Sequence, residues 1–153
     1  MSTMMRKCAS IGAISLASAM GILAGCSQMS QMMGRSHTQQ VTLSGANEVP
    51  PVSTSASGSG TVTVSEHAVS ARITVTGMNA TAAHIHMGAP GANGPVIVPF
   101  TKSGDNTFVA PEGAKMTDEQ YEAYKRGNTY VNVHSARNPG GEVRAQLKGR
   151  KDD

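Results

Sequence analysis

Residues 130–147 read YVNVHSARNPGGEVRAQL, and apolar and polar side chains alternate on either side of the segment 138–141, Asn-Pro-Gly-Gly. Alternation with a period of two is typical of β-strands, whose successive side chains point to opposite faces. Asparagine, proline and glycine favour turns, so the two halves are predicted to pair as an antiparallel hairpin. Its core face is the apolar set Val131, Val133, Val143, Ala145 and Leu147.

The other face of this hairpin is polar. A register that keeps the two faces apart pairs His134 with Glu142, Asn132 with Arg144, and Tyr130 with Gln146. Opposed Cβ atoms lie about 5 Å apart, so Glu142 is predicted to accept a hydrogen bond from His134. Arg144 could then pair with Glu142 or attract an anion. The alternative is a solvated face with ion pairs that contribute little to stability.

The rest of the chain extends the same pattern. Strands are predicted at 40–43, 60–64, 69–75, 82–87, 96–99, 107–109, 129–135 and 142–148. One short helix interrupts them, because Thr117 and Gln120 have capping-box spacing and Gly127 can end a helix. With 17 glycines in the chain, the pattern predicts an all-β fold, an antiparallel β-sandwich or flattened barrel with one short helix.

Three histidines are the candidate metal ligands. His84 and His86 flank Ile85 on a predicted strand, so placing Ile85 in the core puts both imidazoles on the polar side, which also carries His134. Neutral imidazoles suit zinc or copper, and three of them leave one coordination position open. The alternative is a polar face on which the histidines only form hydrogen bonds.

Other polar residues could border this site. Four residues on the same face are predicted to lie next to the metal ligands and orient them: Tyr130, Asn132, Glu142 and Arg144. Glu48 precedes a stiff Pro50-Pro51 pair and could be a supporting acceptor or a fourth ligand; the alternative is that it caps a loop shaped by the prolines.

The N-terminus has the features of a targeting segment. Arg6 and Lys7 precede a short apolar run at 11–23, too short to span a membrane as a stable helix. Leu23-Ala24-Gly25-Cys26 resembles the bacterial lipobox, which implies a lipoprotein signal peptide at 1–25 and a lipid on Cys26. That resemblance implies a lipid-anchored protein of the cell envelope; Ser27 favours the outer membrane, on its periplasmic side or its surface, in a Gram-negative host.

Three further segments follow the signal peptide. Residues 26–38 are predicted to form a flexible Met-rich tether, which could capture copper(I) or be simply a polar linker. Residues 39–149 form the β-domain, and residues 150–153 a frayed tail.

Composition narrows the chemistry. The two cysteines are Cys8, in the signal peptide, and Cys26, so thiolate zinc sites and iron–sulfur clusters are excluded from the β-domain. Without Arg6 and Lys7, the chain has eleven basic and ten acidic residues, and it has no tryptophan. No basic patch or stacking platform for nucleic acid is expected.

Several of these motifs together resemble the CHRD domain, named from chordin. The matching segments are 43–51 (LSGANEVPP), 83–88 (AHIHMG), 130–134 (YVNVH) and 139–147 (PGGEVRAQL); Ala145 stands where the family often has glycine. The resemblance spans the β-domain and implies an extracytoplasmic all-β module, but it implies no particular reaction. The His-x-His element also faintly resembles the copper strand of copper-zinc superoxide dismutases.

Three hypotheses therefore remain open. The first is an exported, lipid-anchored domain that binds copper or zinc through His84, His86 and His134. The second is a non-catalytic module that binds an unknown envelope protein. The third is a superoxide-dismutase-like copper enzyme in which Arg144 draws a small anion to the metal. The residues favour the non-enzymatic hypotheses.

Overall fold

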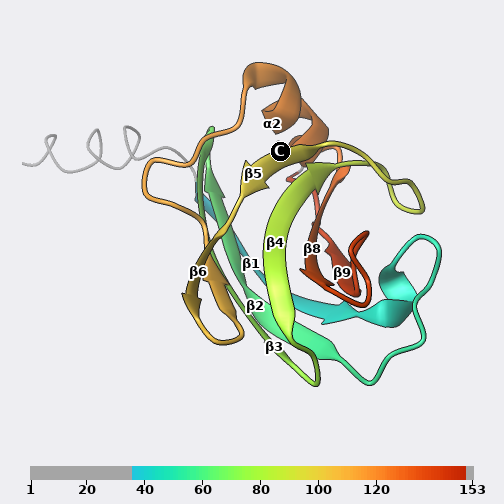
Figure 1. Ribbon diagram of the computed structural model, residues 1–153. Coiled ribbons are helices and arrows are strands. Elements are labelled where there is room, and N and C mark those ends of the chain that lie inside the picture. The colour runs from blue at the N-terminus through green and yellow to red at the C-terminus, as the bar shows by residue number, and fades with distance from the viewer. Residues whose placement is uncertain (1–35, 151–153) are drawn as a thin grey trace, which may run out of the picture. The chain divides into compact units, whose positions relative to one another are not determined.

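The computed structural model describes residues 36–150, which belong to the compact unit Met33–Asp153. The elements are β1 (Ser36–Ser44), η1 (Gly45–Asn47), β2 (Ser57–Ser65), β3 (Ala68–Thr76), β4 (Ala80–Met87), β5 (Val96–Pro99), β6 (Thr101–Gly104), β7 (Thr107–Val109), α2 (Asp118–Lys125), β8 (Thr129–Ser135) and β9 (Val143–Gln146). The expected all-β fold with one short helix is confirmed (Figure 1).

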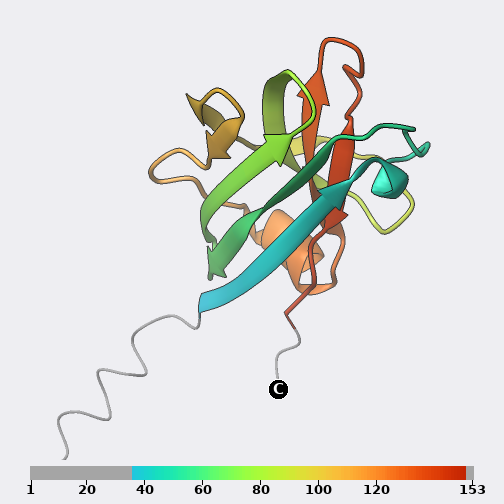
Figure 2. The same ribbon diagram turned by 90° about the horizontal axis from the view of Figure 1, so that it is seen from below.

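The strands form one curled antiparallel sheet. Their order is β5-β4-β8-β9-β1-β2-β3-β7-β6, so β5 and β6 stand at opposite ends of the sheet. Only Phe100 separates these two strands in the chain, so the sheet curls back on itself into a nearly closed barrel. Figure 2 shows the curl from below. The flattened barrel, rather than two separate sheets, is therefore the form that the chain adopts.

Apolar residues from alternate positions fill the barrel. Strand β1 shows the pattern clearly, because Val41 and Leu43 are buried while Thr42 between them is exposed. Ile85 on β4 and Val131 and Val133 on β8 are fully buried in the same cluster. Their removal from water is the main source of stability in a domain without disulfides.

Helix α2 has the predicted ends. The Thr117 side chain accepts from the Gln120 backbone, while the Gln120 side chain accepts from the Thr117 backbone, forming the capping box. Gly127 follows the helix with a φ of +75°, a backbone conformation that favours glycine. Tyr124 is fully buried, so the helix packs its aromatic side on the sheet.

The C-terminal hairpin has the predicted register. Tyr130 pairs with Gln146 and Asn132 with Arg144. The regular ladder ends at Val133, which pairs with Val143 while its carbonyl also accepts from the backbone of Glu142 at 2.8 Å. Glu142 and Val143 therefore both lie opposite Val133, which is a β-bulge. Strand β9 accordingly begins at Val143 rather than at the predicted residue 142.

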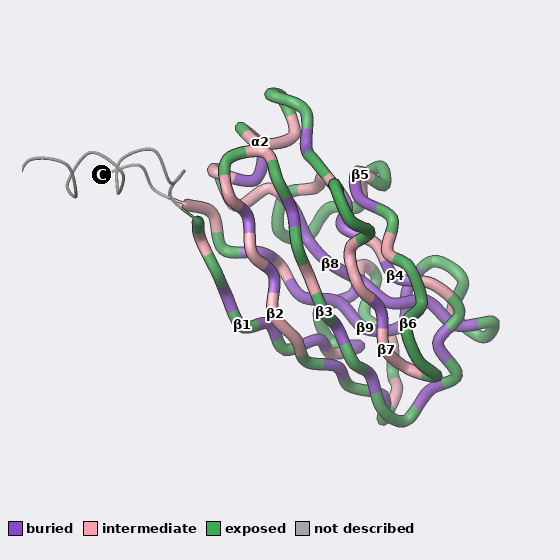
Figure 3. Tube along the Cα trace, turned by 90° about the vertical axis from the view of Figure 1, so that its left-hand side faces the viewer, coloured by how far each residue is buried: buried purple, intermediate pink, exposed green. Residues whose placement is uncertain are grey.

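The polar face of this hairpin is covered, so the alternative of a solvated face is wrong. All seven residues of β8 are buried, as the purple course of β8 in Figure 3 shows. The aliphatic core covers one face. The loops 45–56 and 88–95 contribute the cover on the other, because Arg144 binds both Asn47 and Asn93.

Several strand bounds differ from the sequence predictions, and one strand was not predicted. Strand β1 starts at Ser36, inside the predicted tether, because its whole length pairs with β2 from Ser36↔Ser65 onward. Strand β6 was not predicted: its residues are all exposed and lack apolar alternation, and it forms by pairing with β7. The predicted signal peptide, Cys26 and the predicted tether up to residue 35 lie outside the described residues. Within residues 36–150, no helix is long and apolar enough to cross a membrane.

Candidate metal centre

Strands β4 and β8 bring the three histidines together. They pair antiparallel, with Ala82 opposite His134 and His84 opposite Asn132. Cross-strand partners share a face, so His84 and His86 lie on the side of the sheet that carries His134. Ile85 is 0% exposed in the core on the other side, as its place between two histidines predicted.

The three imidazoles are close enough to share one ion. One ring nitrogen from each of His84, His86 and His134 lies within 4.8 Å of the others. His84 Nδ1 and His134 Nε2 are already 2.9 Å apart. Nitrogens bound tetrahedrally to zinc stand about 3.4 Å apart, given Zn–N bonds of about 2.0–2.1 Å. Adjustments of about 1 Å, within reach of small ring rotations, would bring the set to that spacing.

Backbone carbonyls fix the protonation of two of these rings. His86 Nδ1 lies 2.9 Å from the Gly94 carbonyl oxygen, and His134 Nδ1 lies 2.9 Å from that of Pro139. A carbonyl only accepts, so each Nδ1 must carry the hydrogen. Each Nε2 therefore keeps its lone pair in the neutral ring, and His86 Nε2 is buried without a hydrogen-bond partner. This is the arrangement that orients metal-binding histidines in proteins.

His84 supplies the remaining proton. Since His134 Nε2 can only accept, His84 Nδ1 must donate across the 2.9 Å contact. A metal that takes the lone pair of His134 Nε2 therefore displaces this hydrogen bond. His84 can then bind through Nε2, or through Nδ1 after its proton moves to the other nitrogen.

Burial keeps all three histidines neutral. It lowers the pKa of His84 from 6.5 to about 4, with further lowering by the neighbouring His134 and His86. Burial also lowers the pKa of His86 and of His134, although their backbone carbonyl partners act in the opposite direction. Metal ions compete with protons for imidazole, so rings that stay neutral below pH 6.5 are prepared ligands.

The predicted hydrogen bond from His134 to Glu142 is absent. Because of the bulge, Glu142 accepts instead from the hydroxyls of Ser135 and Thr54, the latter at 2.7 Å. Burial alone would raise the pKa of Glu142, but hydrogen bonds from Ser135, Thr54 and Asn138 and the charge of Arg137 together hold the pKa below its usual value. The carbonyl of Pro139 takes the role that was expected of this carboxylate.

Arg144 secures a loop rather than facing solvent, so its expected role in attracting anions is not supported. It is 1% exposed, and its guanidinium lies 3.5 Å from the centroid of the Tyr130 ring. It donates to Asn93 Oδ1 at 3.1 Å and to the Ala92 carbonyl at 2.9 Å. These bonds hold the 88–95 loop, and thereby the Gly94 carbonyl that orients His86.

Tyr130, Asn132 and Glu48 lie beside the histidines. Tyr130 stacks on His86 with ring centroids 4.8 Å apart, and its hydroxyl accepts from the Gly94 backbone at 3.2 Å. Asn132 and Glu48 both approach Gly141, where an added Cβ would lie 2.6 Å from Asn132 Nδ2 and 2.5 Å from Glu48 Oε1. Glu48 is outside the three-histidine cluster, so its role as a fourth ligand is not supported by this geometry.

Glu48 is a buried carboxyl. It is 5% exposed, and its Oε1 has no hydrogen-bond partner among residues 36–150. Burial raises its pKa to about 7, although the positive charge of Arg144 and a hydrogen bond from Asn132 act to lower it. The protonated carboxyl therefore persists to a higher pH than in an exposed glutamate.

Sequence reasoning missed the two backbone acceptors. Gly94 and Pro139 contribute only their carbonyl oxygens, and no side-chain pattern reports those. The available signal was positional, because a loop rich in glycine and proline follows each histidine motif at 88–95 and 138–141. Such loops permit close backbone approach.

Comparison with known proteins places the chain in a family. No curated protein and no solved structure matches it. The sequence profile of the CHRD domain matches residues 39–147, which is most of the chain and includes all three histidines. The chain therefore belongs to the CHRD domain family.

Proposed function

We propose that this protein binds one transition-metal ion, copper or zinc, through His84, His86 and His134. The observation that carries the proposal is the pair of carbonyl-anchored rings, since Gly94 and Pro139 hold the Nδ1 hydrogens of His86 and His134. The buried, unpartnered Nε2 of His86 supports it, because an orphaned buried acceptor costs free energy unless something binds it. Three nitrogen ligands suit copper and zinc alike.

The proposed setting is the cell envelope. The basic start, the apolar run and the lipobox-like 23–26 segment support export and lipid attachment at Cys26. An outer-membrane lipoprotein would hold the metal site close to the membrane that anchors it. The proposed role is metal capture or envelope metal handling, with the Met-rich tether as an accessory.

Metal stoichiometry tests the proposal. The chain from residue 26 onward, with Cys26→Ser to keep it free of lipid, is titrated with zinc and copper and its bound metal is counted. We expect one equivalent in this parent protein and at least a hundredfold weaker binding in His84→Ala/His86→Ala. His67→Ala is the matched control, because His67 lies outside the cluster and pairs with Asp118. Circular dichroism confirms folding of each variant.

Equal metal content in the parent protein and the double variant would contradict metal binding at this site. The protein-binding hypothesis would then be favoured, and it predicts that stability and partner binding survive treatment with a chelator. The superoxide-dismutase-like alternative loses its main support, because the guanidinium of Arg144 is buried and engaged by the 88–95 loop.

A further inference from the structure

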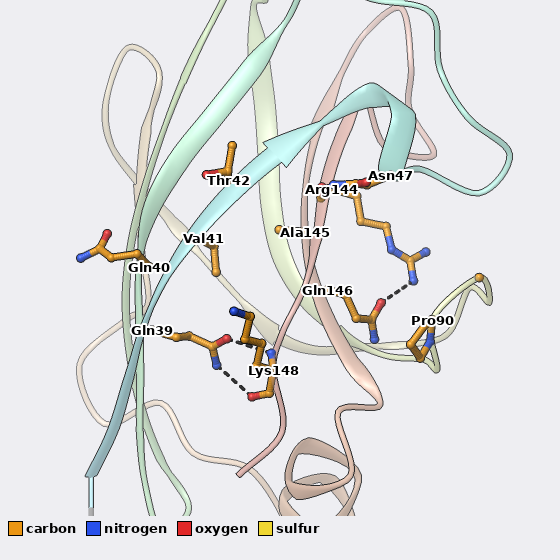
Figure 4. Close-up of a pocket in the computed structure, with 11 residues that line it drawn as sticks. Gln39, Gln40, Val41, Thr42, Asn47, Pro90, Arg144, Ala145, Gln146 and Lys148 are labelled. Atoms are coloured by element: carbon orange, nitrogen blue, oxygen red, sulfur yellow. Dashed lines mark hydrogen bonds between the residues drawn. The ribbon is translucent and has the colours of Figure 1, made fainter.

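A second feature lies at the seam where β1 meets β9. These strands pair only through Ser44↔Arg144. If the ladder continued, Thr42 would pair with Gln146 and Gln40 with Lys148. Instead the strands diverge, and a pocket of about 410 Å³ opens between them (Figure 4). This volume falls within the range of small-molecule sites.

The edges of the two strands face this pocket. The Leu147 N–H donates to Thr129 on β8 at 2.9 Å, and neighbouring residues of an antiparallel strand direct their backbone groups to opposite edges. The N–H and C=O of Gln146 therefore face β1. Gln146 and Thr42 both line the pocket. The pocket thus offers hydrogen-bonding groups of a strand edge.

The side chain of Gln39 shows what kind of group the strand edge can bind. Its side-chain Oε1 accepts from the Lys148 N–H at 2.8 Å, and its Nε2 donates to the Lys148 carbonyl at 3.3 Å (Figure 4). One amide thereby makes the two bonds that a neighbouring strand would make. A peptide group has the same donor and acceptor, so it can satisfy the remaining edge in the same way.

Both ends of the seam are closed. The Ser44↔Arg144 pair closes one end and the Gln39–Lys148 bridge closes the other. Four residues of β1, 40–43, lie between Gln39 and Ser44, which stand about 17 Å apart along the strand at the usual rise per residue. A strand cannot run through such a window, so an internal peptide segment is excluded, whereas a chain end of two or three residues fits.

The charge of the lining decides whether the pocket favours the C-terminal or the N-terminal end of a peptide. The lining residues are Gln39, Gln40, Val41, Thr42, Asn47, Pro90, Gly91, Arg144, Ala145, Gln146 and Lys148. Lys148 is its exposed charged member, since the guanidinium of Arg144 is buried and engaged by the 88–95 loop, and the lining contains no carboxylate. Lys148 is exposed and forms no ion pair within residues 36–150. A carboxylate is therefore attracted and an ammonium group repelled.

We propose that the seam pocket binds the C-terminal end of an extended peptide. The peptide amides bond to the edges at Thr42 and Gln146, and the terminal carboxylate lies near Lys148. This site is separate from the three histidines and does not depend on metal.

The test uses N-acetyl-alanyl-alanine, which has two amides and a free carboxylate, and its C-terminal amide as the uncharged counterpart. Both are titrated into ¹⁵N-labelled protein, residues 26–153 with Cys26→Ser, and backbone amide shifts are followed by NMR. We expect the acid to shift residues 39–42 and 145–148, and the amide to bind about tenfold more weakly. Lys148→Gln should weaken binding of the acid about threefold, the effect of an exposed ion pair. Lys115→Gln, outside the pocket, should not change it.

Equal binding of the acid and the amide would overturn the proposal, as would shifts elsewhere on the protein or no shifts at the solubility limit of the peptide. The titration is repeated with His84→Ala/His86→Ala, in which binding should be unchanged. A failed metal site and a failed peptide site therefore give different results.

Discussion

Replacing Glu48 by glutamine is expected to stabilise the protein at neutral pH. The carboxyl is 5% exposed, its Oε1 has no hydrogen-bond partner in the described chain, and burial raises its pKa from 4.5 to about 7. Glutamine has nearly the same shape but cannot ionise. The substitution therefore removes a group whose ionisation favours the unfolded chain.

The magnitude follows from the two pKa values. Below pH 4.5 the carboxyl is protonated in both states, so its ionisation does not affect stability. As the pH rises from 4.5 to 7, the unfolded chain releases the proton and the folded chain retains it, which lowers the free energy of unfolding by about 1.4 kcal/mol per pH unit. The loss sums to about 3 kcal/mol near pH 7 and levels off above it.

Urea unfolding at pH 4.5 and pH 7.5, with a chelator present, measures this effect. The histidines titrate over the same range in the opposite direction, so the informative quantity is the difference between Glu48→Gln and the parent protein at each pH. We expect almost no difference at pH 4.5, and a variant more stable by about 3 kcal/mol at pH 7.5. A difference that does not change with pH would refute the reasoning.

Glu142→Gln is the matched control with the opposite sign. Hydrogen bonds from Ser135, Thr54 and Asn138 and the charge of Arg137 together outweigh burial and lower the pKa of this carboxyl, so its contribution is present above the unfolded pKa and is lost as the pH falls. The variant should be less stable at pH 7.5, by about 1–3 kcal/mol, and closer to the parent protein in acid.

Three further predictions concern the site and its cover. Arg144→Leu removes the donors that hold Ala92 and Asn93. It should therefore lower the free energy of unfolding, measured in urea, by about 3 kcal/mol and speed hydrogen exchange in the 88–95 loop. Unchanged hydrogen exchange in this loop would contradict the role of Arg144. Gly141→Ala should lower the free energy of unfolding by about 2 kcal/mol or more, because φ is +131° and the new Cβ would meet Glu48. Gly113→Ala, with φ +75° and open space around it, should lower it by about 1 kcal/mol. Equal losses of stability in thermal unfolding would argue against the contact with Glu48. The pH at which zinc affinity begins to fall should lie below 6.5, because burial lowers the pKa of all three histidines; a loss that already begins at the pKa of an exposed histidine, measured in competition with a chelator, would contradict it.

The hairpin register could be predicted because strand alternation and turn residues are local signals. Tyr130 and Asn132 pair with Gln146 and Arg144 as the pattern required. The position of Ile85 likewise placed two histidines on the side of His134, and the three rings do converge. Where one face of a strand is buried, the alternation of apolar and polar residues in the sequence predicts the strand register.

The bulge at Glu142 could not be predicted in this way. A single extra residue moves a side chain off its expected row, and nothing in the alternation of 142–147 signals it. The partners that Glu142 finds, Thr54 and Ser135, are hydroxyl residues that alternation does not identify.

The cover of the polar face depends on tertiary contacts. Loops 45–56 and 88–95 contain no periodic signal, and their positions follow from contacts with Arg144 and with each other. Strand β6 is similar, because its exposed residues become a strand only through pairing with β7. Burial of Arg144 and Glu48 could not be inferred from residue types that are mostly exposed.

The 88–95 loop, whose Gly94 carbonyl orients His86, is tied to the 45–56 loop. Asn93 donates to the Val49 carbonyl at 2.7 Å and accepts from Arg144, so one side chain joins both loops to the sheet. Neither loop can swing away without breaking a bond to the other. An ion bound at the proposed three-histidine site should therefore exchange with bulk solution far more slowly than from a short histidine peptide of equal affinity.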